Sequence, residues 1–485
     1  MEKEQDKELP AGWAECLLID FCCLNMGQSP DSTTYNKIGD GLPFYQGKTD
    51  FGDLYPTPTQ YCNKPNKIGE PGDVILSVRA PVGPTNMLNH SACIGRGLAA
   101  ITPSGNISSK FVLFLFRSVQ HDMSNAGTGT TFKAVTKDFL NRLKFNIPPL
   151  PEQHRIVAKI EELFSELDKG VESLKAAQEQ LKIYRQAVLQ RAFEGKLTEE
   201  WRRAKKDLPT RDALWKQIQE ALSFKLKERE IRPKKIESLS EEELGELSEL
   251  PSEWVWVKLG NVAWSLKDGP HYSPHYVESG IPFISGGNVR PEGVDFLNAK
   301  FISPELHKEL SKRCLPEAGD ILYTKGGTTG IARVNTYGSN FNVWVHVAVI
   351  KLIDGLLPFY VQHCLNSPHC YKQSQKFTHG VGNQDLGLTR MIKITLPICS
   401  QSEQHQVVAE IESRLSVCDK LEESIAQSLL QAEALRQSIL KKAFEGKLVP
   451  QDPQDEPAEK LLARIRAERA QTQPTRKIAK GRKKQ

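Results

Sequence analysis

Two stretches of the chain repeat apolar residues in alternating steps of four and three, which is the pattern of a coiled-coil helix. In the first stretch, residues 152–197, these positions are Ile156, Ile160, Leu163, Leu167, Leu174, Leu181, Tyr184 and Val188, with Gly170 and Ala177 at the two small places. In the second stretch, residues 403–448, they are Val407, Ile411, Cys418, Leu421, Ile425, Ala432, Leu435 and Ile439, with Arg414 and Ser428 as polar substitutes. Because each apolar seam is narrow, each helix is expected to need a partner.

The two helical stretches are copies of equal length. Glu-Gln-His at 152–154 recurs at 403–405, and Ala-Phe-Glu-Gly-Lys-Leu at 192–197 recurs at 443–448, so nothing is inserted or lost between the two motifs. Gly195 and Gly446 suit a left-handed cap at the end of each helix. A helix from residue 156 to residue 188 would be roughly 48 Å long. We expect the two helices to bury their seams against each other as an antiparallel coiled coil; packing of each helix on its own domain is the alternative.

The segments that precede the two helices also resemble each other. Leu9-Pro10 and Trp13 have counterparts in Leu250-Pro251 and Trp254, and the Gly-Asp pair at 72–73 has one at 319–320. Both segments contain short runs of β-type residues separated by Gly and Pro, and each has a helical stretch near its end. These patterns predict two mixed α/β (α+β) domains in a pseudo-two-fold internal duplication.

The helical stretches set the expected domain boundaries. Residues 1–150 form the first globular domain, 151–197 the first helix, 198–250 a charged linker or surface helix, 251–401 the second globular domain, 402–448 the second helix, and 449–485 a tail with a basic end. Within the tail, residues 457–470 have helical periodicity. The basic residues from Arg476 to Lys484 are expected to be a solvated tail, with a phosphate-binding arm as the alternative.

The composition is typical of a soluble protein, with 39% hydrophobic and 25% charged residues among 485. No stretch approaches a membrane-spanning length, and the start MEKEQDKELPAGW lacks the apolar segment of a signal peptide. The ten cysteines include no Cys-x-x-Cys pair, which argues against a zinc ribbon or a disulfide framework. His363-Cys364 and His369-Cys370 are interpreted as part of a core rather than as a metal site. A reduced, cytoplasmic protein is expected.

The motifs that would indicate catalysis are incomplete. Asn146-Ile147-Pro148-Pro149-Leu150 lacks the aromatic residue with which an adenine methyltransferase stacks on a flipped base. The glycine-rich runs 127–131 and 325–330 lack the Gly-Lys-Ser/Thr ending of a nucleotide-binding loop. The net charge of +5 permits nucleic-acid binding without requiring it. A non-catalytic, two-domain binding protein is therefore predicted, suited to two DNA half-sites, with a coiled-coil scaffold or adaptor without sequence-specific DNA binding as the alternative.

The ordered duplication resembles the specificity subunit of type I restriction-modification enzymes over nearly the whole chain. The features that carry the resemblance are the Pro-Leu-Pro-Glu-Gln-His run at 149–154, the Gly-Asp elements, and the paired Ala-Phe-Glu-Gly-Lys-Leu helix ends. The resemblance implies two target recognition domains, each reading one half of a bipartite asymmetric site in double-stranded DNA. It also implies two methyltransferase subunits and restriction subunits as partners. S-adenosylmethionine, ATP and magnesium would belong to those partners, so no cofactor is expected here.

Residues that contact DNA are expected on polar, glycine-flanked loops at matching places in the two domains, because base edges and phosphates are read by such side chains. We hypothesise three matched pairs, Lys48 with Asn288, Arg79 with Lys325, and Lys133 with Gln384, together with His271 and Arg333.

Overall fold

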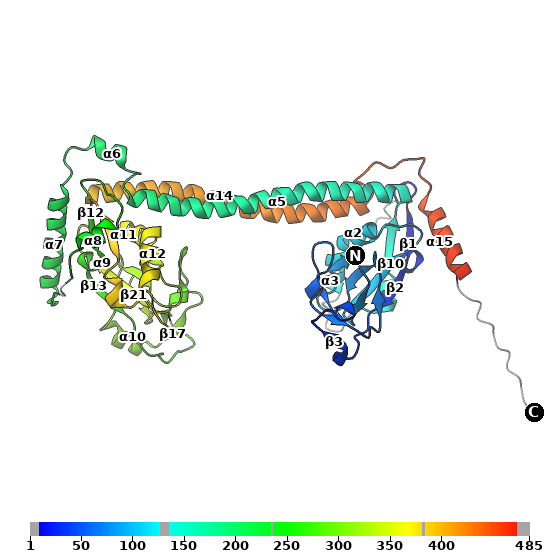
Figure 1. Cartoon of the computed structure of the whole chain (residues 1–485), viewed down its shortest axis with the longest axis horizontal. Helices are drawn as coiled ribbons and strands as arrows, with labels where there is room; N and C mark the ends of the chain where they lie inside the picture. Colours follow the sequence, from blue (N-terminus) through cyan, green and yellow to red (C-terminus); the bar gives the residue numbers. More distant parts are fainter. Residues whose placement is uncertain (1–8, 127–134, 234–235, 381–383, 473–485) are drawn as a thin grey trace, which may run out of the picture. The chain divides into compact units, whose positions relative to one another are not determined.

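The computed structural model describes residues 9–126, 135–233, 236–380 and 384–472. The chain divides into two compact units. Unit 1 comprises Met1–Leu174 and Ala426–Gln485, and unit 2 comprises Lys175–Ile425. Each unit therefore contains one globular domain and one half of each long helix (Figure 1).

Domain 1, the globular part of unit 1, is built on an antiparallel sheet of order β2-β10-β7-β8. Its strands are β2 (Cys22–Met26), β10 (Leu98–Pro103), β7 (Val74–Ser77) and β8 (Thr85–Met87). A second sheet has the order β3-β5-β4-β9-β6, from β3 (Tyr35–Asn36), β5 (Tyr61–Cys62), β4 (Leu42–Tyr45), β9 (Ala92–Ile94) and β6 (Ile68–Gly69). β1 (Ala14–Leu17) pairs with β11 (Lys144–Ile147). The helices are α1 (Leu18–Phe21), α2 (Ser109–Ser118), α3 (Gln120–Ala126) and α4 (Lys137–Asn141).

Domain 2, the globular part of unit 2, repeats this plan. Its main sheet has the order β13-β21-β18-β19, from β13 (Ala263–Asp268), β21 (Val347–Leu352), β18 (Ile321–Thr324) and β19 (Ala332–Val334). The remaining pairings join β17 (Lys300–Ile302), β14 (Ile281–Ile284) and β20 (Asn342–Val343), then β12 (Val255–Lys258) with β22 (Thr395–Ile398), and β15 (Val289–Arg290) with β16 (Gly293–Val294). The helices are α9 (Leu259–Val262), α10 (Pro304–Ser311), α11 (Pro358–Leu365), α12 (Pro368–Phe377) and α13 (Leu388–Met391). The predicted duplication is thus present in the strand order itself.

The two long helices are α5 (Leu150–Phe193) and α14 (Gln401–Phe444), each of 44 residues. They lie side by side and antiparallel (Figure 1). In unit 2, Arg185 of α5 bonds to Asp419 and Glu422 of α14 at 2.6 and 3.0 Å. In unit 1, Arg436 of α14 forms an ion pair with Asp168 of α5. The predicted antiparallel coiled coil is confirmed.

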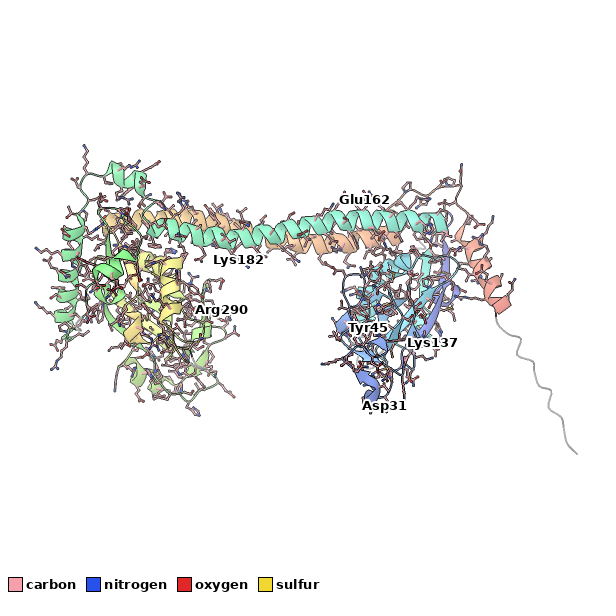
Figure 2. All side chains as sticks on the ribbon, in the orientation of Figure 1. Asp31, Tyr45, Lys137, Glu162, Lys182 and Arg290 are labelled. Carbon is pink, nitrogen blue, oxygen red and sulfur yellow. The ribbon has the colours of Figure 1, made fainter. Side chains whose placement is uncertain are left out.

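The seam of this coiled coil differs in detail from the predicted heptads. Gly170, Ala177 and Tyr184 are exposed, and the half-buried positions of α5 are one residue later, at Val171, Gln178 and Arg185. Likewise Leu421 and Leu435 of α14 are about half exposed, at 48% and 49%. The prediction was wrong at these positions because it continued the row that begins at Leu163. Val171, Gln178 and Arg185 instead follow buried Phe164 at seven-residue steps, so the heptad is kept in a row one residue later. Glu162 and Lys182, labelled in Figure 2, are exposed on α5.

The end of each long helix closes onto the start of a globular domain. In unit 2, Gly195 has φ +72°, and a Cβ on it would lie 2.5 Å from Pro251. In unit 1, Gly446 has φ +70°, and a Cβ would lie 2.5 Å from Pro10. Both glycines form the predicted left-handed caps, which only glycine adopts without strain.

A tryptophan of each domain reaches the first turn of the adjoining helix. Trp13 donates its indole N–H to Glu152 at 3.2 Å, and Trp254 donates to Glu403 at 2.9 Å. Glu403 is 1% exposed and also binds Arg202. The repeated Trp and Glu-Gln-His motifs therefore serve to dock each domain on its helix.

The linker and the tail both contribute helices that cover a domain. The linker forms α6 (Glu199–Ala204), α7 (Arg211–Glu228) and α8 (Glu241–Gly245), and the tail forms α15 (Ala458–Thr472). α7 contacts α9 of domain 2, and α15 contacts α1, the corresponding helix of domain 1. The basic end of the tail, 473–485, lies outside the described residues. Among the described helices, none is both long and apolar enough to cross a membrane.

Candidate nucleic-acid interface

Domain 1 has a basic cleft where three loops meet. The cleft has a volume of about 330 Å³ and is lined by residues 46–49, 77, 79–81 and 96–97. Lys48, Arg79 and Arg96 line it and are exposed. Among the described residues, none of these three side chains has a hydrogen bond or an ion pair, and the lining contains no Asp or Glu. Such a concentration of unpaired cations favours an anionic ligand.

Glycines allow the loops of this basic cleft to approach one another closely. A Cβ on Gly97 would lie 2.2 Å from the backbone oxygen of Gln46, a distance that no side chain tolerates. Gly95 lies against Gln46 as well, where a Cβ would be 3.1 Å from its Cα. Arg96 is therefore held beside Lys48 by a turn that needs glycine on both sides.

Backbone hydrogen bonds show which loop residues of the two domains correspond. Val78 donates its N–H to the carbonyl of Gly97 at 2.9 Å, and Lys325 donates to the carbonyl of His346 at the same distance. Both residues follow the last position of the strand that begins after the shared Gly-Asp pair. Lys325 therefore corresponds to Val78, and the expected match of Lys325 with Arg79 was wrong by one residue.

The same register gives the counterparts of the three cations of the basic cleft. Arg79 corresponds to Gly326, and Arg96, one position before Gly97, corresponds to Val345. Lys48 corresponds to Gly287, because Tyr45 pairs with Ile94 as Ile284 pairs with Val343. Asn288 accordingly matches Thr49 rather than Lys48. No lysine or arginine occupies any of the three equivalent positions in domain 2.

Lys325 lies inside domain 2, and its side chain is only 3% exposed. Its ammonium is 3.3 Å from Asp268 and 3.0 Å from Asp385. Asp268 is 2% exposed and also bonds to Arg313 at 2.8 Å and to His271 at 3.3 Å. The expectation that Lys325 contacts DNA does not fit this placement, because the ammonium is enclosed and already paired with two carboxylates. We name Lys325, Asp268 and Asp385 the buried ionic cluster.

The remaining candidates lie in different surroundings. Asn288 is 7% exposed, and its amide accepts from the N–H of Ser285 at 2.9 Å, so it shapes a turn instead of facing solvent. His271 is exposed beside Asp268, and the carbonyl of Gln384 accepts from Gly327 N–H at 3.4 Å, so both border the loops around Lys325.

Arg333 lies apart from these loops, on β19. It donates from Nε to the carbonyl of Arg290, which Figure 2 labels, at 3.0 Å. Burial lowers the pKa of the Arg333 guanidinium. Lys133 lies outside the described residues.

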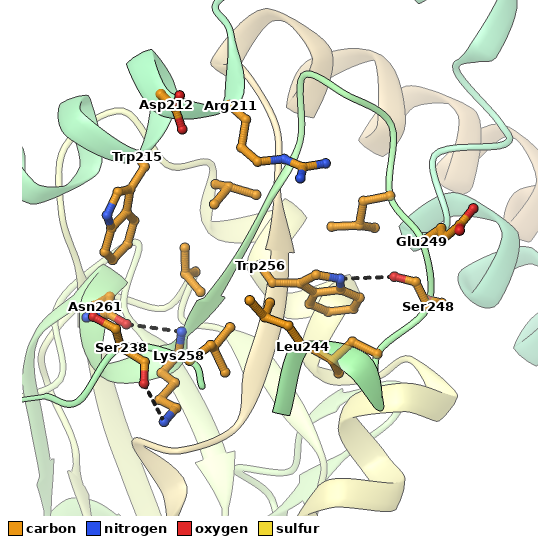
Figure 3. A pocket seen from close by; sticks show the side chains of 15 residues that line it. Arg211, Asp212, Trp215, Ser238, Leu244, Ser248, Glu249, Trp256, Lys258 and Asn261 are labelled. Atoms are coloured by element: carbon orange, nitrogen blue, oxygen red, sulfur yellow. Dashed lines mark hydrogen bonds between the residues drawn. The ribbon is translucent and has the colours of Figure 1, made fainter. Parts of the chain in front are cut away.

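Several residues of these loops were not found from the sequence. Arg96 was the easiest of them to predict from the sequence, since an arginine between two glycines in a loop is a recognisable signal. Arg313, Asp268 and Asp385 carry no local signal, because their partners come from separate segments. Also unexpected is a cavity of about 590 Å³ where the linker folds over β12. Apolar side chains such as Trp215 and Leu244 and polar ones such as Lys258 line it in nearly equal numbers (Figure 3).

The family model of the type I restriction modification DNA specificity domain matches residues 10–176 and 251–431. The chain belongs to this family. Each of the two matched stretches contains one globular domain and the first part of the long helix that follows it. The predicted resemblance to type I specificity subunits is thereby confirmed, and DNA recognition is the role of the family.

Relatives match the chain either in part or throughout. The putative MjaX specificity subunit of Methanocaldococcus jannaschii is 36% identical over 199 residues, which are 40% of this chain and 46% of that protein. The EcoKI specificity subunit of Escherichia coli strain K12 is 24% identical over 505 residues, or 96% of this chain and 97% of that protein. The duplicated organisation is therefore matched from end to end in at least one relative.

Solved structures share the fold. A chain from a type I restriction-modification assembly has a TM-score of 0.63 and 19% identity, covering 91% of this chain and 100% of its own length. The HsdS subunit from Thermoanaerobacter tengcongensis has a TM-score of 0.52 and 18% identity, covering 92% and 100%. The predicted mixed α/β domains with two long helices are confirmed as the fold of this family.

Proposed function

We propose that this specificity-family chain reads a bipartite, asymmetric sequence in double-stranded DNA, one half with each globular domain. The basic cleft of domain 1 is the observation that carries the proposal, because it offers three unpaired cations on glycine-flanked loops. The corresponding loops of domain 2 carry different residues, so the two domains are suited to unlike half-sites. Division of one site between two linked modules is a common way to read DNA.

The chain acts without chemistry of its own in this proposal. Two methyltransferase subunits would carry S-adenosylmethionine, and restriction subunits would carry ATP and magnesium. The work would take place in the cytoplasm, where the DNA lies. One of the structural relatives comes from an assembled type I system, which supports a role for the chain within a larger complex.

Exposed apolar side chains on the long helices support such partners. In unit 2, Ile183 of α5 and Val417 of α14 are 62% and 57% exposed. In unit 1, Leu430 of α14 is 75% exposed. Burial of these apolar side chains under a protein partner would remove them from water and so favour binding.

The test is sequencing of modified bases in a host that lacks other methyltransferases. The chain is co-expressed with a type I methyltransferase subunit from the same source, with the methyltransferase alone as the control. We expect methyladenine in a gapped, asymmetric motif only when both proteins are present. An assembled and active methyltransferase that yields no such motif would favour the scaffold function instead.

A further inference from the structure

We propose that the basic cleft binds one phosphate of the DNA backbone through Lys48, Arg79 and Arg96, and that domain 2 has no such site because the His346 side chain fills its place. This inference rests on the proposed function, and it assigns unequal chemistry to the two domains. Domain 1 would hold its half-site partly through charge, whereas domain 2 would rely on other contacts.

The charge of the basic cleft supports a phosphate. Its three cations come from three separate segments, and none is neutralised by a partner among the described residues. Asp50, the acid nearest to Lys48 along the chain, accepts a hydrogen bond from Thr59 at 2.7 Å. Arginine and lysine side chains that converge without a carboxylate form charge-assisted hydrogen bonds with phosphate oxygens.

In domain 2, the counterpart of this cleft is filled from the opposite loop. A Cβ on Gly326 would lie 2.1 Å from Nδ1 of His346, so the imidazole occupies the space that the first atoms of the Arg79 side chain take in domain 1. At the position of His346, domain 1 has Gly97. The two domains have therefore exchanged which loop carries a side chain and which carries glycine.

The His346 ring is held in place. It lies edge-on to Trp344, with 4.9 Å between the ring centroids. Its Nδ1 atom is buried and has no hydrogen-bond partner among the described residues. A ring fixed in this way separates the two loops where domain 1 leaves a cleft open, and the neighbouring positions, Gly287 and Val345, add no charge.

The exchange can be reversed by substitution. Gly326 does not have a positive φ, and the atoms that a Cβ there would meet belong to the His346 side chain, so this position accepts an ordinary side chain once His346 is removed. The double variant Gly326→Arg with His346→Gly would place the Arg79 and Gly97 of domain 1 at the corresponding positions of domain 2, which adds one of the three cations. Removing His346 first clears the space that the new side chain needs.

The experiment measures the affinity of the assembled complex of chain and methyltransferase for a duplex that carries its methylated motif, over a range of salt concentrations. The triple variant Lys48→Ala, Arg79→Ala, Arg96→Ala is expected to bind at least about tenfold more weakly. The slope of log affinity against log salt is expected to fall by about 1, as for the loss of one phosphate contact. The fold-loss of affinity should be equal for the duplex with the motif and for duplexes with one changed base pair. The Gly326→Arg, His346→Gly variant should steepen the slope.

Lys144→Ala is the control for Lys48→Ala alone, because each variant removes one exposed lysine of domain 1. Lys144 lies outside the basic cleft and is paired with Glu15 at 2.7 Å. An equal effect of this control would show that net charge matters and would overturn the proposal. An unchanged slope with lost discrimination at one base pair would also overturn it, since that result indicates contact with a base. If the triple variant binds normally while the unchanged complex prefers its motif, the phosphate site is refuted and the proposed function stands. A complex without any preferred sequence refutes both.

Discussion

Loss of the Lys325 ammonium alone should destabilise unit 2 far more than loss of the Lys325 and Asp268 charges together. In Lys325→Val, Asp268 stays in its buried position, with 2% exposure, but loses a cation 3.3 Å away, while its other partner Arg313 is 55% exposed and screened by water. Removing one partner of a buried ion pair costs about 3 to 5 kcal/mol, because the other charge stays buried without compensation.

The double variant Asp268→Met, Lys325→Val should recover most of this cost. It places in domain 2 the residues Met26 and Val78 that occupy the corresponding positions of domain 1. Replacement of a buried pair by apolar residues of similar size is often neutral or stabilising. We expect the double variant to lie within about 1.5 kcal/mol of the unchanged chain, so the two substitutions should be coupled by at least about 2 kcal/mol.

A double-mutant cycle by urea unfolding measures this coupling. Tryptophan fluorescence reports the transition, because six of the seven tryptophans, including the fully buried Trp254, lie in unit 2. Hydrogen exchange of β13 and β18 confirms that the loss of stability is local. Arg313→Ala is the control, with a loss below about 1 kcal/mol because this arginine is more than half exposed. Additive effects of Asp268→Met and Lys325→Val would refute the reasoning, because they would show that the two charges do not depend on each other.

Three further predictions concern stability. Burial lowers the pKa of His363 from 6.5 to about 4, so as pH falls through this range the unfolded chain binds a proton that the folded chain does not, and the free energy of unfolding falls by up to about 3 kcal/mol. His363→Gln should therefore make the free energy of unfolding in urea depend less on pH between about pH 7 and pH 5. An unchanged pH dependence would contradict this. Arg202→Ala should cost about 3 kcal/mol by thermal unfolding, since it strips a cation from the buried Glu403, whereas the double variant Arg202→Ala, Glu403→Gln should cost clearly less; equal losses would count against an uncompensated charge. Gly446→Ala should lower the melting temperature, because the φ of +70° and the nearby proline exclude a Cβ. Gly170→Ala, at an open position on α5, should instead add about 0.5 to 1 kcal/mol to the free energy of unfolding. A more stable Gly446→Ala variant than Gly170→Ala variant would show that the cap does not need glycine.

The sequence was sufficient for the organisation of the chain and insufficient for its loops. Equal spacing of the motifs identified two helices of one length, and the glycines after them gave the caps, because both features depend on local chemistry alone. The seam was harder, since Leu163 and Phe164 are both apolar, and the sequence alone does not show which of them begins the row that faces the partner helix. Tyr184 was therefore placed inside, and Arg185, which bonds across the coiled coil, was overlooked.

The candidate site shows the same limit. Counting from the shared Gly-Asp pair would have matched Lys325 with Val78. The prediction instead matched Lys325 with Arg79 because both are basic. A shift of one residue along a strand moves a side chain to the opposite face of the sheet. Asn288 is a polar residue in a loop, as expected of a DNA contact, yet its amide is used within a turn. Which polar side chains are consumed inside a domain depends on contacts between distant segments, such as Asp268 with Lys325, that one sequence does not reveal.

The cover that α15 gives domain 1 also decides when each unit is complete during synthesis. Unit 2 is one continuous stretch of chain, so all of its residues have left the ribosome while the tail is still being made. Unit 1 is discontinuous: the core around Phe111 and Ile156 also contains Leu461 and Ile465 from the last helix. Domain 1 is therefore synthesised first but completes its core last. Until α15 packs on it, chaperones or its own loops must cover its apolar surface.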